Sequence, residues 1–155
     1  MHMVLSTLNE TKLKEHKGKN ILCLDYGSKV IGMAFFRPIL EPIPYPLGRI
    51  INKSLPQTMK EIQQVIQNEM IDFIIVGVPH LLDGKETSST ARVHSFISEL
   101  KNHFPHLPLY EQDETLSTQA AKERMQNSPL YNFRVNMEKI DEVSAVIILE
   151  DFFGH

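Results

Sequence analysis

The chain contains 155 residues, the length of one ordinary domain, which leaves no room for a second full one. Hydrophobic residues make up 42% and charged residues 23% of the chain, so its composition excludes a wholly disordered protein and a fibrous repeat. The formal net charge is −3, which excludes nucleic-acid binding by overall charge alone, because proteins that bind in that way are basic, and any such binding must come from a local site.

The first 19 residues show neither a helical nor a strand period, and they carry four Lys and two Glu. We predict that residues 1–19 form a loosely ordered extension, as the ends of chains commonly do. The apolar runs begin after Asn20, and we expect residues 20–155 to form a single domain.

Beyond residue 20, short continuous apolar runs alternate with longer stretches whose apolar residues recur every three or four positions. The short runs predict buried strands and the periodic stretches predict helices. The predicted strands cover residues 21–24, 30–36, 47–51, 73–77 and 107–111. The predicted helices cover residues 55–70, 88–103, 116–125 and 139–153, with a polar, mobile loop over 126–137. This order predicts an α/β fold with a mixed central sheet of about five strands flanked by helices.

Acidic residues cluster where predicted strands end and where the last helix begins. Asp25 ends the first strand, Asp113 and Glu114 follow the last strand, and Asp141 and Glu142 open the final helix. Functional groups of α/β sheets gather at the carboxyl ends of the strands. Converging carboxylates select Mg²⁺ or Mn²⁺, and two such ions can activate water for phosphodiester cleavage. A purely structural role stays open, because acids in a first helical turn also favour the helix dipole.

Four segments of the chain, in the same order, resemble the motifs of one protein family. They are Leu24 to Ala34 with Asp25-Tyr26-Gly27-Ser28, Val76-Gly77-Val78-Pro79 with Asp83-Gly84, Asp113-Glu114-Thr115-Leu116-Ser117-Thr118 with Ala121, and Asp141 to Glu150. These segments resemble the YqgF family, also called RuvX, whose members are RNase H-like Holliday junction resolvases that are also proposed as pre-16S rRNA nucleases. The resemblance spans about residues 20–153.

The resemblance implies an RNase H-like domain and a nuclease that depends on Mg²⁺ or Mn²⁺, with two ions bound. It implies Asp25, one or both acids of the Asp113/Glu114 pair and Asp141 as metal ligands, with Asp25 contacting both ions. We expect the catalytic set to be Asp25, Glu114 and Asp141. Glu114 is preferred within its pair because its longer side chain reaches further. Asp141 is preferred to Glu142 on the resemblance alone, since both flank the apolar stripe of the last helix.

Three basic residues near these motifs are candidates for contacts to phosphate. They are Lys29 in the predicted hairpin, Lys85 after the second motif and Arg92 on the following helix. Arg92 is the best candidate, because it matches a position that is frequently basic in the family. Thr115 stands where the family usually has Arg, and Thr cannot clamp a phosphate with two hydrogen bonds as a guanidinium can. For each cation taken alone, a solvated surface charge is the competing interpretation.

The leading functional hypothesis is a metal-dependent endonuclease acting on structured nucleic acid. By the resemblance, its reaction is 5′-end processing of pre-16S rRNA, Holliday junction resolution, or both. The alternative is a non-catalytic nucleic-acid-binding factor in ribosome maturation or transcription, which the missing Arg at Thr115 motivates. An actin-like ATPase shares the opening Asp25-Tyr26-Gly27-Ser28 pattern, but that class needs a second such domain. A resolvase acts on two opposite strands, which would favour a homodimer.

The single cysteine and the absence of a long apolar run bear on the cellular compartment of the protein. Cys23 lies within an apolar strand, so we predict a buried structural thiol rather than a nucleophile. One cysteine excludes an intrachain disulfide and fits a reducing compartment. No segment approaches the roughly 18 consecutive apolar residues of a membrane helix. The sequence therefore predicts a cytoplasmic protein without a membrane partner.

Overall fold

A five-stranded mixed sheet forms the centre of the computed structural model, which describes residues 8–80, 85–114 and 117–154. The strand order is β3-β2-β1-β4-β5. The strands are β1 (Ile21–Tyr26), β2 (Val30–Phe36), β3 (Tyr45–Ile51), β4 (Phe73–Pro79) and β5 (Leu109–Glu114). The first three pair antiparallel as a meander, and β4 and β5 run parallel to β1. The predicted α/β fold with a mixed sheet is therefore confirmed.

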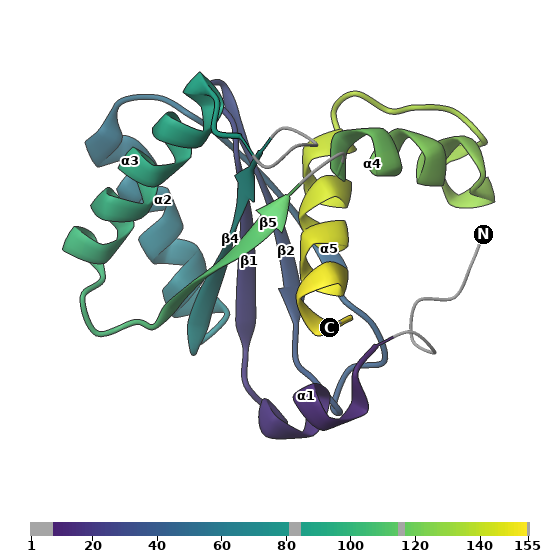
Figure 1. Ribbon diagram of the computed structural model, residues 1–155, viewed down its shortest axis with the longest axis horizontal. Helices are drawn as coiled ribbons and strands as arrows, with labels where there is room; N and C mark the ends of the chain where they lie inside the picture. The colour runs from purple at the N-terminus through teal and green to yellow at the C-terminus, as the bar shows by residue number, and fades with distance from the viewer. Residues whose placement is uncertain (1–7, 81–84, 115–116, 155) are drawn as a thin grey trace.

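Helices cover both faces of this sheet (Figure 1). Helices α2 (Leu55–Asn68) and α3 (Ser88–His103) lie on one face, and α5 (Ile140–Phe153) lies on the other, with α4 (Ser117–Gln126) packed against it. A short 3₁₀ turn, η2 (Pro129–Tyr131), lies between α4 and α5. None of the helices among the described residues is long and apolar enough to cross a membrane.

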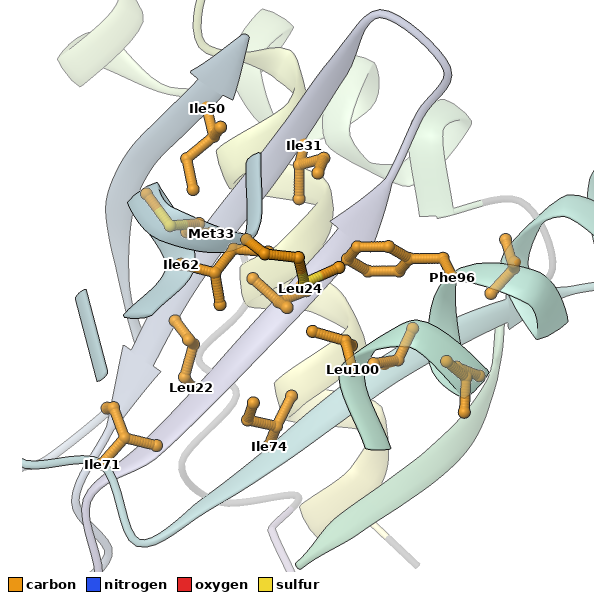
Figure 2. Close-up of a cluster of buried hydrophobic side chains, with 14 of the residues drawn as sticks. Leu22, Leu24, Ile31, Met33, Ile50, Ile62, Ile71, Ile74, Phe96 and Leu100 are labelled. Carbon is orange, nitrogen blue, oxygen red and sulfur yellow. The ribbon is translucent and has the colours of Figure 1, made fainter. Parts of the chain in front are cut away.

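The two faces of β1 explain its continuous apolar run. Leu22 and Leu24 point into the cluster under α2 and α3, part of which Figure 2 shows. Ile21 and Cys23 point the other way, into the cluster under α5. Cys23 is fully buried, and burial, followed by the charges of nearby carboxylates, raises the pKa of its thiol well above the usual range. The prediction of a buried structural thiol is thereby confirmed.

Helix α5 begins directly on top of β2, and a glycine makes this approach possible. A Cβ atom at Gly32 would lie 2.1 Å from the backbone carbonyl oxygen of Asp141. The next residue on the same face of β2 is Ala34, which is also small and fully buried under α5. These small side chains let the helix backbone approach the sheet closely, so they fix where Asp141 lies.

The structure differs from the sequence prediction over residues 8–19, which are not loosely ordered. A short helix, α1 (Glu10–Glu15), packs against the end of α5. The backbone N–H of Asn9 donates to the carbonyl of Phe153 at 2.6 Å, and Lys12 Nζ donates to the carbonyl of Phe152 at 2.5 Å. These contacts supply partners for terminal carbonyls that a helix cannot satisfy internally. A helix of six residues is too short to produce a detectable hydrophobic period.

The last strand is also longer than its apolar pattern predicts. Pairing of β5 with β4 continues to Pro79 opposite Glu114, whereas the predicted strand ends at residue 111. Asp113 and Glu114 are therefore consecutive residues within a strand, and their side chains point to opposite faces of the sheet. The hydrogen bonds of parallel pairing extend the strand through polar residues that the hydrophobic pattern cannot identify.

Candidate active site

Three of the predicted acidic residues meet where β1, β4 and β5 end. A cavity of about 300 Å³ opens at this edge of the sheet. Asp25 enters it from β1, Glu114 from β5 and Asp141 from the first turn of α5. We call it the acidic cavity, and its lining residues are Asp25, Tyr26, Gly27, Ser28, Pro79, Ser89, Arg92, Val93, Glu114, Thr118 and Asp141.

Asp25 and Glu114 reach each other across the intervening strand β4. Gly77 of β4 lies beneath the Glu114 side chain, and a Cβ atom there would lie only 2.9 Å from Glu114 Oε2. Because Gly77 has no side chain, the Glu114 carboxyl group can lie over β4, and its charge raises the pKa of Asp25. The Ser117 hydroxyl donates to Glu114 Oε1 and holds this side chain from the start of α4. Gly77 and Ser117 both lie in the motif segments, but the sequence indicated neither role.

The environment of Asp25 disfavours its negative charge. Asp25 is only 9% exposed, and burial, followed by the charges of Glu114 and Asp141, raises the pKa of its carboxyl group well above the usual range. Burial also raises the pKa of Glu114, although the hydrogen bonds from Ser117 and Asp25 partly oppose that shift. Carboxyl groups crowded in this way bind either protons or cations.

The structure separates Asp141 from Glu142, which the sequence could not do by geometry. Asp141 lines the acidic cavity, and burial raises the pKa of its carboxyl group while the charge of Arg49 opposes the shift. Glu142 turns toward β3, where its Oε1 accepts a hydrogen bond from the backbone N–H of Gly48 at 2.9 Å. Lys139 Nζ lies 3.5 Å from the other oxygen of Glu142. Glu142 therefore ties α5 to β3.

Arg49 is a charge near the site that the sequence analysis missed, since it opposes the rise in the pKa of Asp141. It lies on β3 directly opposite Gly32 of β2, the residue over which the backbone of Asp141 passes. Arg49 belongs to none of the motif segments. Pairing the predicted strands 30–36 and 47–51 as a hairpin would have placed its charge near the start of the last helix.

Asp113, which the sequence also predicts as a metal ligand, is not among the residues that line the acidic cavity. Its side chain is 82% exposed, and its Oδ1 lies 3.3 Å from Nδ1 of His80. The alternation of β5 explains this, since Glu114 uses the face that leads into the cavity and Asp113 uses the other.

Replacing Asp113 by Asn should therefore leave nuclease activity within about twofold of wild type and stability within about 0.5 kcal/mol, as expected for an exposed residue. Steady-state cleavage kinetics and urea unfolding measure the two quantities. If Asp113→Asn lost as much activity as Asp25→Asn, Asp113 would have to take part in the reaction.

Among the three predicted cations, only Arg92 lines the acidic cavity. Arg92 projects from α3, where its guanidinium donates to Ser89 Oγ at 3.1 Å. Thr87 caps α3 in a reciprocal capping box with Thr90, and the Thr90 hydroxyl also donates to the carbonyl of Pro79. These bonds tie the start of α3 to the end of β4 and so position Arg92 beside the acids.

The remaining predicted positions contribute less to the described cavity. Lys29 is exposed in the turn between β1 and β2, and Lys85 is exposed ahead of α3; neither is among the lining residues. Asp83, Gly84 and Thr115 lie outside the described residues.

The donor set of the acidic cavity fits a hard divalent cation chemically. Its three candidate ligands are carboxylates, which Mg²⁺ and Mn²⁺ prefer, and their mutual repulsion is what a cation would relieve. As they stand, no three His, Cys, Asp or Glu side chains of the described residues are arranged to hold a metal ion.

Comparison with known proteins identifies similar sequences over nearly the whole chain. The family model RuvX, described as "Holliday junction resolvase", matches residues 19–155. Two relatives carry the name "Putative pre-16S rRNA nuclease". The protein of Maridesulfovibrio salexigens is 31% identical over 136 residues, covering 86% of this chain and 97% of the relative. The protein of Shewanella oneidensis is 33% identical over 135 residues, covering 87% and 94%.

Solved structures share the fold at low sequence identity. Thermus thermophilus RuvC in complex with a Holliday junction substrate has a TM-score of 0.52 and 11% identity, covering 84% of this chain and 91% of RuvC. The Fowlpox virus resolvase, solved with Holliday junction DNA, has a TM-score of 0.52 and 12% identity, covering 87% and 96%. The fold is therefore the RNase H-like fold of the RuvC-type resolvases.

Proposed function

Since the chain belongs to the RuvX family of Holliday junction resolvases, we propose that it is a nuclease that hydrolyses phosphodiester bonds at the acidic cavity. One observation carries this proposal. Asp25, Glu114 and Asp141 are far apart in the sequence, yet their carboxyl groups line one cavity beside the guanidinium of Arg92. Burial raises the pKa of all three acids, and the charges of Glu114 and Asp141 raise the pKa of Asp25 further, so a bound cation would relieve an unfavourable arrangement of charge.

We propose that Asp25, Glu114 and Asp141 hold Mg²⁺ or Mn²⁺, with two ions bound and Asp25 shared between them. Bound divalent ions supply water activation and stabilise the charge that develops during phosphodiester hydrolysis. The residues of this chain prepare the site for them. Ser117 orients Glu114 by a hydrogen bond, and the absence of a side chain at Gly77 leaves space for the Glu114 carboxyl group. The position of α5 on β2 places Asp141 at the cavity. Arg92 contacts the phosphate of the substrate and takes the part expected of the Arg that Thr115 replaces.

The proposed substrate is the precursor of 16S rRNA, cleaved near its 5′ end. The supporting observation is the name shared by relatives that are about a third identical along almost their full length. A four-way DNA junction is the second candidate, which the description of the family model favours. For the junction, two active sites must face opposite strands, and we propose a homodimer in that case. Light scattering of the protein with and without junction tests it.

The test is cleavage of both substrates by the purified protein. A pre-16S rRNA fragment with its 5′ leader and a four-way DNA junction are each incubated with Mn²⁺, Mg²⁺ or EDTA. We expect cleavage that requires the ion and disappears in the Asp25→Asn variant. Isothermal titration with Mn²⁺ should show binding that the same substitution removes. If wild type and Asp25→Asn both bind nucleic acid but neither cleaves it, the chain is a non-catalytic nucleic-acid-binding factor. Equal cleavage by the two proteins would mean that Asp25 does not take part in the reaction.

A further inference from the structure

A second cavity of about 490 Å³ adjoins the acidic cavity. Tyr26, Ser28 and Arg92 line both, so the two cavities are neighbours at the end of β1. Asp25 points to the α5 face of the sheet, and Tyr26 points to the face covered by α2 and α3. We call the second cavity, on the α2 and α3 side of the sheet, the Tyr26 cavity.

An aromatic pair forms one wall of the Tyr26 cavity. The ring of Tyr26 stacks on that of Phe96, with centroids 4.3 Å apart and an angle of 30° between the planes. Phe96 is only 4% exposed and is part of the core beneath, so it holds Tyr26 in place. Leu55 and Ala91 also line the cavity. A flat apolar surface with a fixed aromatic ring suits a flat partner such as a nucleobase.

Two cations line the Tyr26 cavity. Arg92 projects from α3 and also lines the acidic cavity, and Lys53 comes from the segment after β3. Glu99 is seven residues after Arg92 on α3, or about 10 Å further along the helix, so the acid is at the far end. Lys53 Nζ is 3.3 Å from Glu61 in a half-exposed ion pair, which costs little to exchange for a phosphate. An anion is therefore favoured between Lys53 and Arg92.

Hydrogen bonds hold the Lys53 wall against the turn after β1. Asn52 Nδ2 donates to the carbonyl of Gly27 at 3.0 Å, and Asn52 Oδ1 accepts from the Thr58 hydroxyl at 3.1 Å. The backbone N–H of Lys53 donates to the same hydroxyl at 3.1 Å. The cavity is consequently built before any ligand arrives, which lowers the entropy lost on binding.

We propose that the Tyr26 cavity binds one unpaired nucleotide of the substrate strand, next to the bond that is cleaved. The base lies against the ring of Tyr26, and the phosphate lies between Lys53 and Arg92. The nucleotide must be unpaired, because stacked bases of a duplex have both faces covered. This inference rests on the proposed function for the location of the cleaved bond, but the binding itself does not depend on cleavage.

The test measures binding separately from cleavage. Single-stranded RNA containing 2-aminopurine is titrated into Asp25→Asn protein, and quenching of the base reports stacking; the chain has no Trp to interfere. Removing the ring with Tyr26→Leu should weaken binding at least about fivefold and abolish the quenching, whereas Tyr26→Phe should retain both. Lys53→Gln alters an exposed side chain and should lower the slope of log affinity against log salt by about 0.7. The charge-matched control Lys101→Gln, outside the cavity, should leave the affinity and quenching unchanged.

Cleavage assays complete the test. On a substrate that wild type cuts, an abasic residue should reduce kcat/KM only when it lies beside the cleaved bond. If Tyr26→Leu and Lys53→Gln bind with unchanged affinity, quenching and salt slope, the nucleotide site is wrong even where cleavage is normal. If wild type cleaves nothing but these two substitutions still weaken binding, the nuclease proposal fails and the nucleotide site stands.

Discussion

Replacing Asp25 by Asn should abolish the proposed ion-dependent cleavage and at the same time stabilise the protein in EDTA. Loss of the carboxylate shared by the proposed ions should reduce kcat/KM by about 10³-fold or more, since such ions supply several kcal/mol of stabilisation to the transition state. Without ions, however, the charge of Asp25 is buried beside Glu114 and Asp141. Asn carries no charge and can still donate to Glu114, so the free energy of unfolding should increase. Each kcal/mol gained would raise Tm by about 2–4 °C.

The gain in stability depends on pH in a defined direction. The pKa of Asp25 is raised in the folded protein, so folding favours its protonated form. The stability that this residue contributes is complete below the pKa of an unfolded Asp, about 3.9, and is lost as pH rises through the raised folded value. The difference in Tm between Asp25→Asn and wild type should therefore grow with pH over that range.

Thermal unfolding in EDTA and in Mn²⁺ measures this prediction. Added Mn²⁺ should stabilise wild type by binding to its folded state and should leave Asp25→Asn unchanged. Asp113→Asn removes the same charge from an exposed position and should behave as wild type throughout. A Tm of Asp25→Asn below that of wild type in EDTA at neutral pH would mean that the buried carboxyl group of Asp25 does not destabilise the folded protein.

Replacing Gly32 by Ala should damage both the fold and the site, although it adds one methyl group. The new Cβ would lie 2.1 Å from the carbonyl oxygen and 2.2 Å from the carbonyl carbon of Asp141. These are backbone atoms, so the start of α5 must move by about 1 Å to reach normal contact distances. Overpacking of this kind costs about 2–3 kcal/mol. A displacement of about 1 Å at Asp141 should also reduce kcat/KM by about 10²-fold.

Urea unfolding and cleavage kinetics check the Gly32 prediction. Gly154→Ala is the matched control, because that glycine is exposed after α5 and its Cβ would meet no atom closer than 3.2 Å. The control should change stability by less than about 0.5 kcal/mol. Equal stability of the two variants would mean that α5 adjusts its position on β2 without cost.

The order of strands and helices could be predicted because it follows from burial. The run Ile21 to Leu24 is apolar at every position since both faces of β1 are covered, and the helices show their buried stripes. The motif segments also indicated which acids would meet. Asp25 could be assigned to the end of its strand because the apolar run stops there.

The details of the site depend on contacts between distant segments, which local patterns do not contain. The choice between Asp113 and Glu114 follows from the pairing of β5 with β4, and the choice between Asp141 and Glu142 follows from where α5 crosses β2 and β3. Arg49 and the Tyr26 cavity arise in the same way, from strands and helices brought together by the fold. Helix α1 is stabilised by the carbonyls of α5 rather than by its own periodicity.

Helix α1 has a consequence for anyone who trims the protein to its family boundary. The family match begins at residue 19, so a chain shortened to that point loses Leu13 and the ring of His16, which packs on Phe73, Phe152 and Phe153. The aromatic end of α5 would then face water as a connected apolar patch, a feature that promotes aggregation. Poor recovery of the shortened chain would thus reflect an uncovered surface rather than a failure of the nuclease domain to fold.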